Sequence, residues 1–216
     1  MKHFTYKIDH DFGLAPNPFW GYCTLAICKS SIRRNRNLNI GSWVFGTGSV
    51  KLKNLHKLIY AMRVDETLTF NEYWNDPRFS HKKPILSGSL PQLYGDNVYH
   101  QDPTTGIWIQ EDSAHSLANG LVNQKHLDRD ISGKNVLISQ NFYYFGDHAV
   151  DIPQDLIEST CTNSRDKQFV EEEPAIQLLL WLEREGYNKN YLYGNPISWK
   201  QHAKKIYLIL SDLKLD

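Results

Sequence analysis

The chain has 216 residues, of which 41% are hydrophobic and 22% are charged, an ordinary globular composition that excludes collagen, coiled coil and wholesale disorder. No apolar run approaches the roughly 18 residues of a membrane-spanning helix, and the N-terminal segment lacks the apolar stretch of a signal peptide. Three cysteines are too few for a disulfide framework. We therefore expect a cytoplasmic protein that makes no contact with a membrane.

The net charge is zero, but the two signs are unevenly distributed along the chain. Residues 1–64 contain ten Lys or Arg and two Asp, whereas residues 65–216 contain fourteen basic and twenty-two acidic residues. The basic first part predicts an anionic partner such as a nucleotide or DNA. The alternative is that the two parts attract each other within one domain.

Short apolar segments with an alternating pattern dominate the first two thirds of the chain and predict strands. They lie at residues 4–8, 22–29, 42–46, 57–64, 98–100, 107–110, 135–139 and 142–145. The turn sequence at 102–106 predicts a hairpin between two of them. Thr69 and Glu72 have the spacing of a capping box, which begins a short helix.

The last third of the chain has helical periodicity. Helices are expected over residues 153–159, 170–185 and 198–210, the last beginning at a second capping box, Ser198 with Gln201. This order predicts an α+β fold, with a curved or barrel-like, mostly antiparallel sheet, peripheral helices and the C-terminal helices last. We expect a single domain over residues 1–190 and a helical extension, residues 191–216, packed on it.

The cysteines give no sign of a site. Cys23 and Cys28 lie five positions apart on a predicted strand and so on opposite faces, and Cys161 stands alone. All three are expected to be small buried side chains. Because no GxSxG elbow is present either, any catalysis is expected to be acid–base chemistry by histidines and carboxylates.

The densest cluster of polar side chains lies on both sides of the predicted hairpin. His100, Asp112 and His115 are the acid–base candidates, with Asp96 orienting one of them. The same cluster is also consistent with recognition of the hydrogen-bonding edge of a base, or with a polar rim of no further function. No HxxxH or HExxH spacing predicts a metal site, and the sequence identifies no cofactor.

A basic loop and a glycine-containing turn supply candidate contacts to a nucleotide or nucleic acid. Arg33, Arg34 and Arg36 are expected to bind phosphate. Thr47 and Ser49 follow a predicted strand, either facing a ligand or forming a tight turn. Further contacts are expected from Lys82, Lys83, Tyr94, Asn97, Trp108, Gln110 and Ser113.

Several strings within residues 1–185 carry a family resemblance. They are APNPF (15–19), GSWVFGTGS (41–49), LIYAMRV (58–64), TFNEYW (69–74), DPRF (76–79), KKP (82–84), YGDNVYH (94–100), WIQEDSAHS (108–116) and VLIS (136–139). Together they resemble the second family of nucleotide-modification-associated domains, bacterial and phage proteins linked by genome context to DNA base modification. The succession of strands is also similar to PUA-like and EVE-like barrels, which hold modified or flipped bases.

The resemblance implies a protein that recognises or acts on a nucleobase or nucleotide, in DNA modification or phage conflict. Three functions stay open at this point. The hairpin rich in His and Asp favours an enzyme, and the basic first part favours a non-catalytic reader of modified bases. The Leu-rich C-terminal helices favour a structural partner within a modification complex.

Overall fold

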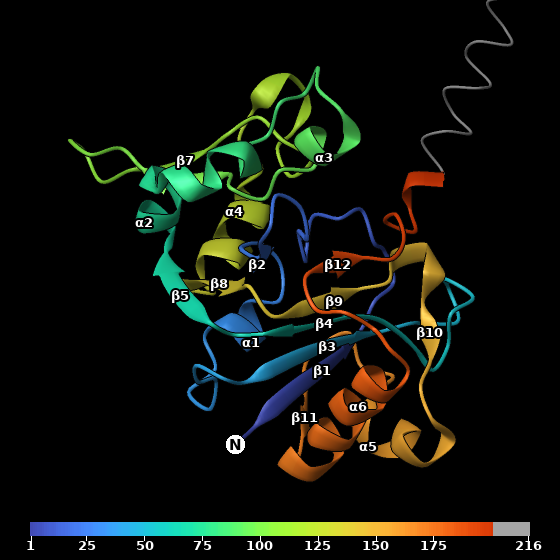
Figure 1. Ribbon diagram of the computed structural model, residues 1–216. Helices are drawn as coiled ribbons and strands as arrows, with labels where there is room; N and C mark the ends of the chain where they lie inside the picture. The colour runs from blue at the N-terminus through green and yellow to red at the C-terminus, as the bar shows by residue number, and fades with distance from the viewer. Residues whose placement is uncertain (201–216) are drawn as a thin grey trace, which may run out of the picture.

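The protein is described by a computed structural model, in which residues 1–200 are placed (Figure 1). Its largest sheet has the strand order β11-β1-β3-β4-β9-β12, and β10 pairs with β4. The strands are β1 (His3–Lys7), β3 (Trp43–Thr47), β4 (Lys57–Arg63), β9 (Phe142–Tyr144), β10 (Val150–Asp151), β11 (Gln168–Val170) and β12 (Tyr191–Leu192). The pairs β1–β3 and β9–β12 are parallel, and the other pairs in this sheet are antiparallel.

A second sheet has the order β2-β8-β5, and a separate hairpin joins β6 to β7. These strands are β2 (Cys23–Leu25), β5 (Glu66–Thr69), β6 (Tyr99–Gln101), β7 (Trp108–Gln110) and β8 (Asn135–Ser139). The fold is therefore mixed α and β with several sheets. Within residues 1–200 no sheet closes on itself, because β11 and β12 remain edge strands, so the barrel expected from the PUA-like similarity is not found.

The helices are short, apart from one. They are α1 (Ser30–Arg33), α2 (Phe70–Asn75), α3 (Leu90–Leu93), α4 (Gln124–Ile131), α5 (Ile157–Thr160) and α6 (Glu172–Arg184). The predicted capping box begins α2: the Glu72 amide donates to Thr69 Oγ1 at 3.2 Å, and the Thr69 amide donates to Glu72 Oε2 at 2.7 Å. Most of the helix predicted at 198–210 lies outside the described residues.

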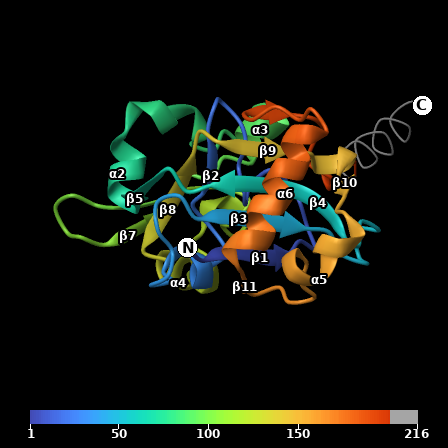
Figure 2. The same ribbon diagram turned by 60° about the horizontal axis from the view of Figure 1, so that its bottom comes forward.

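Helix α6 lies across one face of the main sheet (Figure 2). Trp43 and Phe45 of β3 face this helix and pack in one cluster with its buried residues Leu178 and Leu182. Val44, between them in the strand, points to the opposite face and packs between the two sheets. The sheet is thus covered on both faces, by helices on one and by the second sheet on the other.

Strand β2 differs from its prediction in a way that matters for the site. The apolar pattern predicted a strand over 22–29, but β2 ends at Leu25, and Cys28 lies in a bend. Helix α4 was not predicted: Leu127 and Ile131 have helical spacing, but they are its only strongly apolar residues and do not stand out in a short polar segment. Both segments contribute to the wall of one cavity, the first through Cys28 and helix α4 through Arg129.

Two ion pairs join a basic residue of the first part to an acidic residue of the second, Lys2 to Glu171 and Lys57 to Asp151. A third pair, Arg165 with Asp9, has the opposite arrangement of charges. The fold therefore brings oppositely charged residues of the two parts together. Residues beyond 190 contribute to the same body, since β12 pairs with β9 and the Asp11 amide donates to Ser198 Oγ at 3.1 Å. Across the described part of the chain, no helix is long and apolar enough to cross a membrane.

Two leucines on α6 test how much of the stability comes from its packing against the sheet. Leu178 is fully buried and Leu180 is 58% exposed. We expect Leu178→Ala to lower the free energy of unfolding by about 2–5 kcal/mol, because it removes buried methyl groups and leaves a cavity. Leu180→Ala should change it by less than about 0.5 kcal/mol. Urea unfolding measures both, and equal losses would contradict the assigned faces of α6.

Candidate functional site

Cys28 lies at a sharp bend between β2 and α1. Cys28 and Lys29 have φ angles of 55° and 41°, in the left-handed region that residues with a side chain rarely adopt. The Cys28 amide donates to Asp130 Oδ1 at 2.9 Å, which helps to hold this conformation. The bend places Cys28 at the wall of a cavity. Strained backbone of this kind clusters at functional sites.

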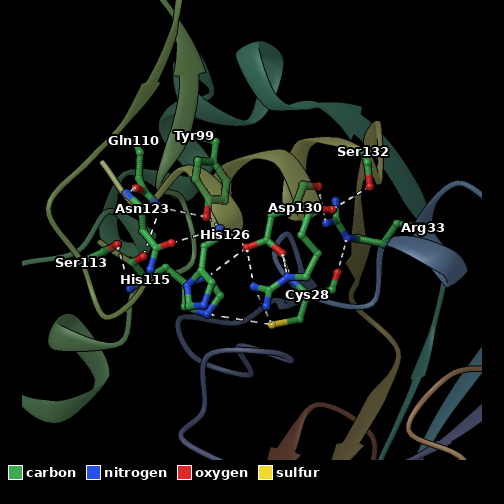
Figure 3. A network of polar contacts seen from close by, with 11 residues as sticks. Cys28, Arg33, Tyr99, Gln110, Ser113, His115, Asn123, His126, Asp130 and Ser132 are labelled. Atoms are coloured by element: carbon green, nitrogen blue, oxygen red, sulfur yellow. Dashed lines mark hydrogen bonds and ion pairs between the residues drawn. The ribbon is translucent and has the colours of Figure 1, made fainter. Parts of the chain in front are cut away.

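Cys28, His115 and Asp130 form a chain of contacts (Figure 3). The Cys28 sulfur lies 3.9 Å from His115 Nε2, and His115 Nδ1 lies 2.9 Å from Asp130 Oδ2. His115 comes from the loop before α4 and Asp130 from α4 itself. A thiol, an imidazole and a carboxylate in this order can generate a nucleophilic thiolate and keep the imidazole oriented.

Asp130 is the negative centre of this triad. It is completely buried and also accepts hydrogen bonds from the Tyr99 hydroxyl at 3.0 Å and from Arg129 Nε at 2.8 Å. Burial raises the pKa of Asp130, but the bonds from His115 and Arg129 hold that pKa well below its usual range. Burial lowers the pKa of His115, yet its bonds to Asp130 and Cys28 raise it to about 9. His115 is therefore protonated at neutral pH.

Arg33 fixes two members of the triad through their backbone. Its guanidinium is fully buried and donates to the carbonyl oxygens of Cys28 at 2.9 Å, Asp130 at 2.6 Å and Asn135 at 2.8 Å. The expectation that Arg33 binds phosphate is wrong, because these carbonyls already occupy its donors away from solvent. Arg33 is instead a positioning residue for the site.

Two predicted ligand contacts also position the triad. Gln110 Nε2 donates to the His115 carbonyl at 3.2 Å and to the Tyr99 hydroxyl at 3.1 Å. Ser113 Oγ accepts the His115 amide at 3.2 Å. Both side chains are buried, at 5% and 8% exposure, so they shape the His115 loop and are not exposed to a ligand.

The cavity beside Cys28 has a volume of about 880 Å³, within the range of roughly 300–1,000 Å³ common for ligand sites. Its wall comes from β1 and the loop after it, the start of α1, and residues 165–166, and it includes Cys28, His115 and Arg129. Five Lys or Arg and two Asp line it. We call this the Cys28 cavity.

The triad also has the donor set of a metal site. One ligand atom from each of Cys28, His115 and Asp130 lies within 4.8 Å of the others. However, Arg129 Nη2 donates to the Cys28 sulfur at 3.7 Å and to Asp130 Oδ2 at 3.1 Å. A bound cation would face this guanidinium at close range, and the repulsion between the two positive charges disfavours a metal ion at these three atoms.

The other predicted catalytic residues lie apart from the triad. His100 stacks on Trp74 with ring centroids 4.0 Å apart and pairs with Glu111 at 2.8 Å. Asp112 is exposed and accepts the Ser116 hydroxyl at 2.8 Å. Asp96 is buried and accepts hydroxyls from Thr24 at 2.7 Å and Tyr73 at 2.8 Å. Of the four catalytic candidates, His115 is the one that lines the Cys28 cavity.

Several predicted binding residues are structural instead. Lys82 is fully buried, and its ammonium donates to Asn17 Oδ1 and to the backbone carbonyls of Asn17 and Tyr22 at 2.8–3.0 Å. Asn97 is also buried and donates to the Tyr73 carbonyl at 3.0 Å. The expectation that Lys82 and Asn97 contact a ligand is wrong, because both are enclosed by the loops that they hold together.

Aromatic packing and strand turns account for other members of the predicted set. Tyr94 stacks on Phe12 at 5.2 Å, Trp108 contacts the Phe70 ring at 5.7 Å, and the Lys83 ammonium lies 3.6 Å from the Trp74 ring centroid. Thr47 and Ser49 are buried, so the turn after β3 is a structural turn rather than a ligand-facing one. Arg34 and Arg36 are exposed, and phosphate binding by them stays a prediction.

Sequence reasoning missed Cys28 and Asp130. Ser30 and Ser31, directly after Cys28, are typical of a helix start and could have indicated that the strand ends earlier. The expectation of buried cysteines holds for Cys23 and is wrong for Cys28 and Cys161, which are both half-buried. Cys28 lies at the cavity wall. Asp130 gave no signal, because it lies among other charged residues of a short polar helix.

Fold and site together define a protein of mixed α and β structure with a Cys–His–Asp triad at a cationic cavity. The sequence matches the family model described as nucleotide modification associated domain 2 over residues 1–203. The chain belongs to this family, which confirms the resemblance and supports a general role in nucleotide modification. No curated protein and no solved structure matches the chain.

The triad predicts a stability that falls at alkaline pH. The pKa of His115 is raised from 6.5 to about 9 in the folded state. Between these two pH values the folded protein keeps a proton on His115 that the unfolded chain releases. This difference adds up to about 3 kcal/mol to the free energy of unfolding. The contribution is complete below pH 6.5 and is lost as the pH rises through 9. Urea unfolding at several pH values measures it. His115→Gln should flatten this part of the profile, and an unchanged slope would contradict the ion pair.

Proposed function

We propose that the protein is an enzyme of nucleotide modification in which Cys28 attacks an electrophilic carbon of a nucleobase or nucleotide. His115 transfers the proton, and Asp130 orients and charges His115. The observation that carries this proposal is the Cys28–His115–Asp130 chain of contacts at the wall of a ligand-sized cavity. The family membership supplies the nucleotide setting.

The environment of the sulfur favours an anionic nucleophile. His115 is protonated at neutral pH and lies 3.9 Å from the Cys28 sulfur, and the Arg129 guanidinium lies 3.7 Å from it. Two cationic donors next to one sulfur stabilise a thiolate. The Cys28 side chain is half-buried, which leaves it open to the cavity.

The covalent step requires only the substrate, Cys28 and His115. The Cys28 thiolate donates an electron pair to the substrate carbon, and a carbon–sulfur bond forms. The pair displaced from the double bond of that carbon moves to the neighbouring atom, which takes the proton from His115 Nε2. Reversal of these transfers breaks the carbon–sulfur bond and returns the proton to the imidazole.

This proposal replaces the acid–base site expected around His100 and Asp112. His115 keeps its proton-transfer role, but its partners are Cys28 and Asp130, from distant parts of the sequence. A non-catalytic reader of bases would use the same cavity without needing a reactive thiol. The reactivity of Cys28 therefore separates the two functions.

We expect iodoacetamide to alkylate Cys28 at neutral pH faster than either other cysteine, because the charged His115 and Arg129 side chains lie next to its sulfur. Cys23 is fully buried, and burial raises the pKa of Cys161 to about 11. The rate at Cys28 should fall by about tenfold or more in His115→Gln. Mass spectrometry of the modified protein gives the rate at each cysteine.

Cys161→Ser is the matched control and should leave the fast reaction in place, whereas Cys28→Ser should abolish it. Circular dichroism and a thermal melt confirm that each variant is folded. Cys28 reacting no faster than Cys161, or at the same rate with and without His115, would refute the nucleophile and leave the reader as the better function.

A further inference from the structure

The Cys28 cavity is also lined by cationic side chains that lie outside the triad. Lys7, Lys51 and Arg165 line it and come from β1, from the loop after β3 and from the loop before β11. We call these three side chains the cationic rim. None of the three belongs to the triad. Three cationic side chains at one cavity favour the binding of an anionic group of a ligand.

The acidic residues in the cavity wall offset only part of the charge of its cations. Asp9 forms an ion pair with Arg165. Burial would raise the pKa of Asp9, but its hydrogen bonds from Ser49 and Arg165 lower that pKa. Asp166 accepts the Ser31 hydroxyl. Lys51 Nζ lies 2.7 Å from His10 Nε2, and among the described residues no carboxylate forms an ion pair with it. The rim therefore keeps an excess of positive charge.

The wall of the Cys28 cavity also has an apolar part, to which Tyr6, Phe12 and Leu14 contribute. The Phe12 ring stacks on His10 and on Tyr94, and the Lys29 ammonium lies 3.9 Å from the Tyr6 ring centroid. Apolar contact with a base is therefore expected from ring edges and from Leu14, while the rim accepts phosphate.

Several basic residues outside the cavity are already engaged in contacts within the protein. Arg33, at the centre of the basic loop, is fully buried on carbonyl oxygens. Lys2 and Lys57 are paired with Glu171 and Asp151 from the acidic part of the chain. Within the described residues, the cations that surround a ligand-sized space are those of the cavity.

We infer that the Cys28 cavity binds a free nucleoside phosphate, with its phosphate on the cationic rim and its base toward Cys28. The inference deepens the proposed function and rests on it for the location of the site. It assigns the substrate class as a nucleotide before incorporation into DNA, rather than a base within a DNA strand.

The test uses the full chain with Cys28→Ser, which keeps the cavity and removes the nucleophile. Calorimetric titrations compare the common deoxynucleoside monophosphates and triphosphates, the matching nucleosides, and a single-stranded oligonucleotide. We expect at least one nucleotide to bind about tenfold or more tightly than its nucleoside, because charge-assisted hydrogen bonds hold the phosphate. The oligonucleotide should bind more weakly than that nucleotide.

Matched variants locate the phosphate. Lys51→Gln and Arg165→Gln should each weaken nucleotide binding by about tenfold. Lys53→Gln is the control for Lys51, since it lies two positions away, exposed and outside the cavity wall. Arg184→Gln is the control for Arg165, because the two side chains have exposures of 76% and 75% and Arg184 lies on α6. Both controls should bind as before.

Three results would overturn the inference. One is the absence of any preference for a nucleotide over its nucleoside, and another is an equal effect of the rim and control variants. The third is tighter binding of the oligonucleotide that is lost in the rim variants, which would assign the cavity to a DNA strand. Nucleotide binding together with an unreactive Cys28 would refute the proposed function and leave this inference standing.

Discussion

The buried carboxylate of Asp130 is the interaction on which the site depends. It joins the bend at Cys28, the hairpin residue Tyr99, the His115 loop and helix α4, all through hydrogen bonds of 2.8–3.1 Å. A buried charge with this many partners is costly to remove, about 3–5 kcal/mol when one side of an ion pair is deleted. The same bonds that stabilise the fold therefore also set the charge and orientation of His115.

Buried cations hold loops together both at this carboxylate and elsewhere in the fold. Arg33 donates to the carbonyls of Cys28 and Asp130, and Lys82 donates to acceptors on Asn17 and Tyr22. Burial lowers the pKa of Lys82 to about 8, with Asp96 as the largest opposing influence. Arg33 and Lys82, which the sequence suggested as phosphate ligands, therefore bind backbone and side-chain oxygens inside the protein. The cations that line the cavity belong to no motif that the sequence analysis identified.

The sequence predicted elements well where the local pattern agrees with the packing. The hairpin, the strand at 135–139 and the capping box of α2 are confirmed, since alternation and capping are local properties. The prediction failed at 22–29, where a continuous apolar run conceals the bend after Leu25. Ala26 and Ile27 are buried without being in the strand, and apolar residues give the same pattern in both cases.

The amino-acid sequence by itself determined the family, the mixed α and β class and one member of the triad, His115, because these follow from motifs and local periodicity. It did not determine that Cys28 and Asp130, separated by about a hundred residues, meet at His115. That meeting depends on the left-handed bend after β2 and on Arg33, which ties both backbones together. Contacts between residues so far apart in the chain produce no recognisable spacing pattern in the sequence. Only the tertiary structure therefore decided which cysteine faces the cavity and which cations surround it.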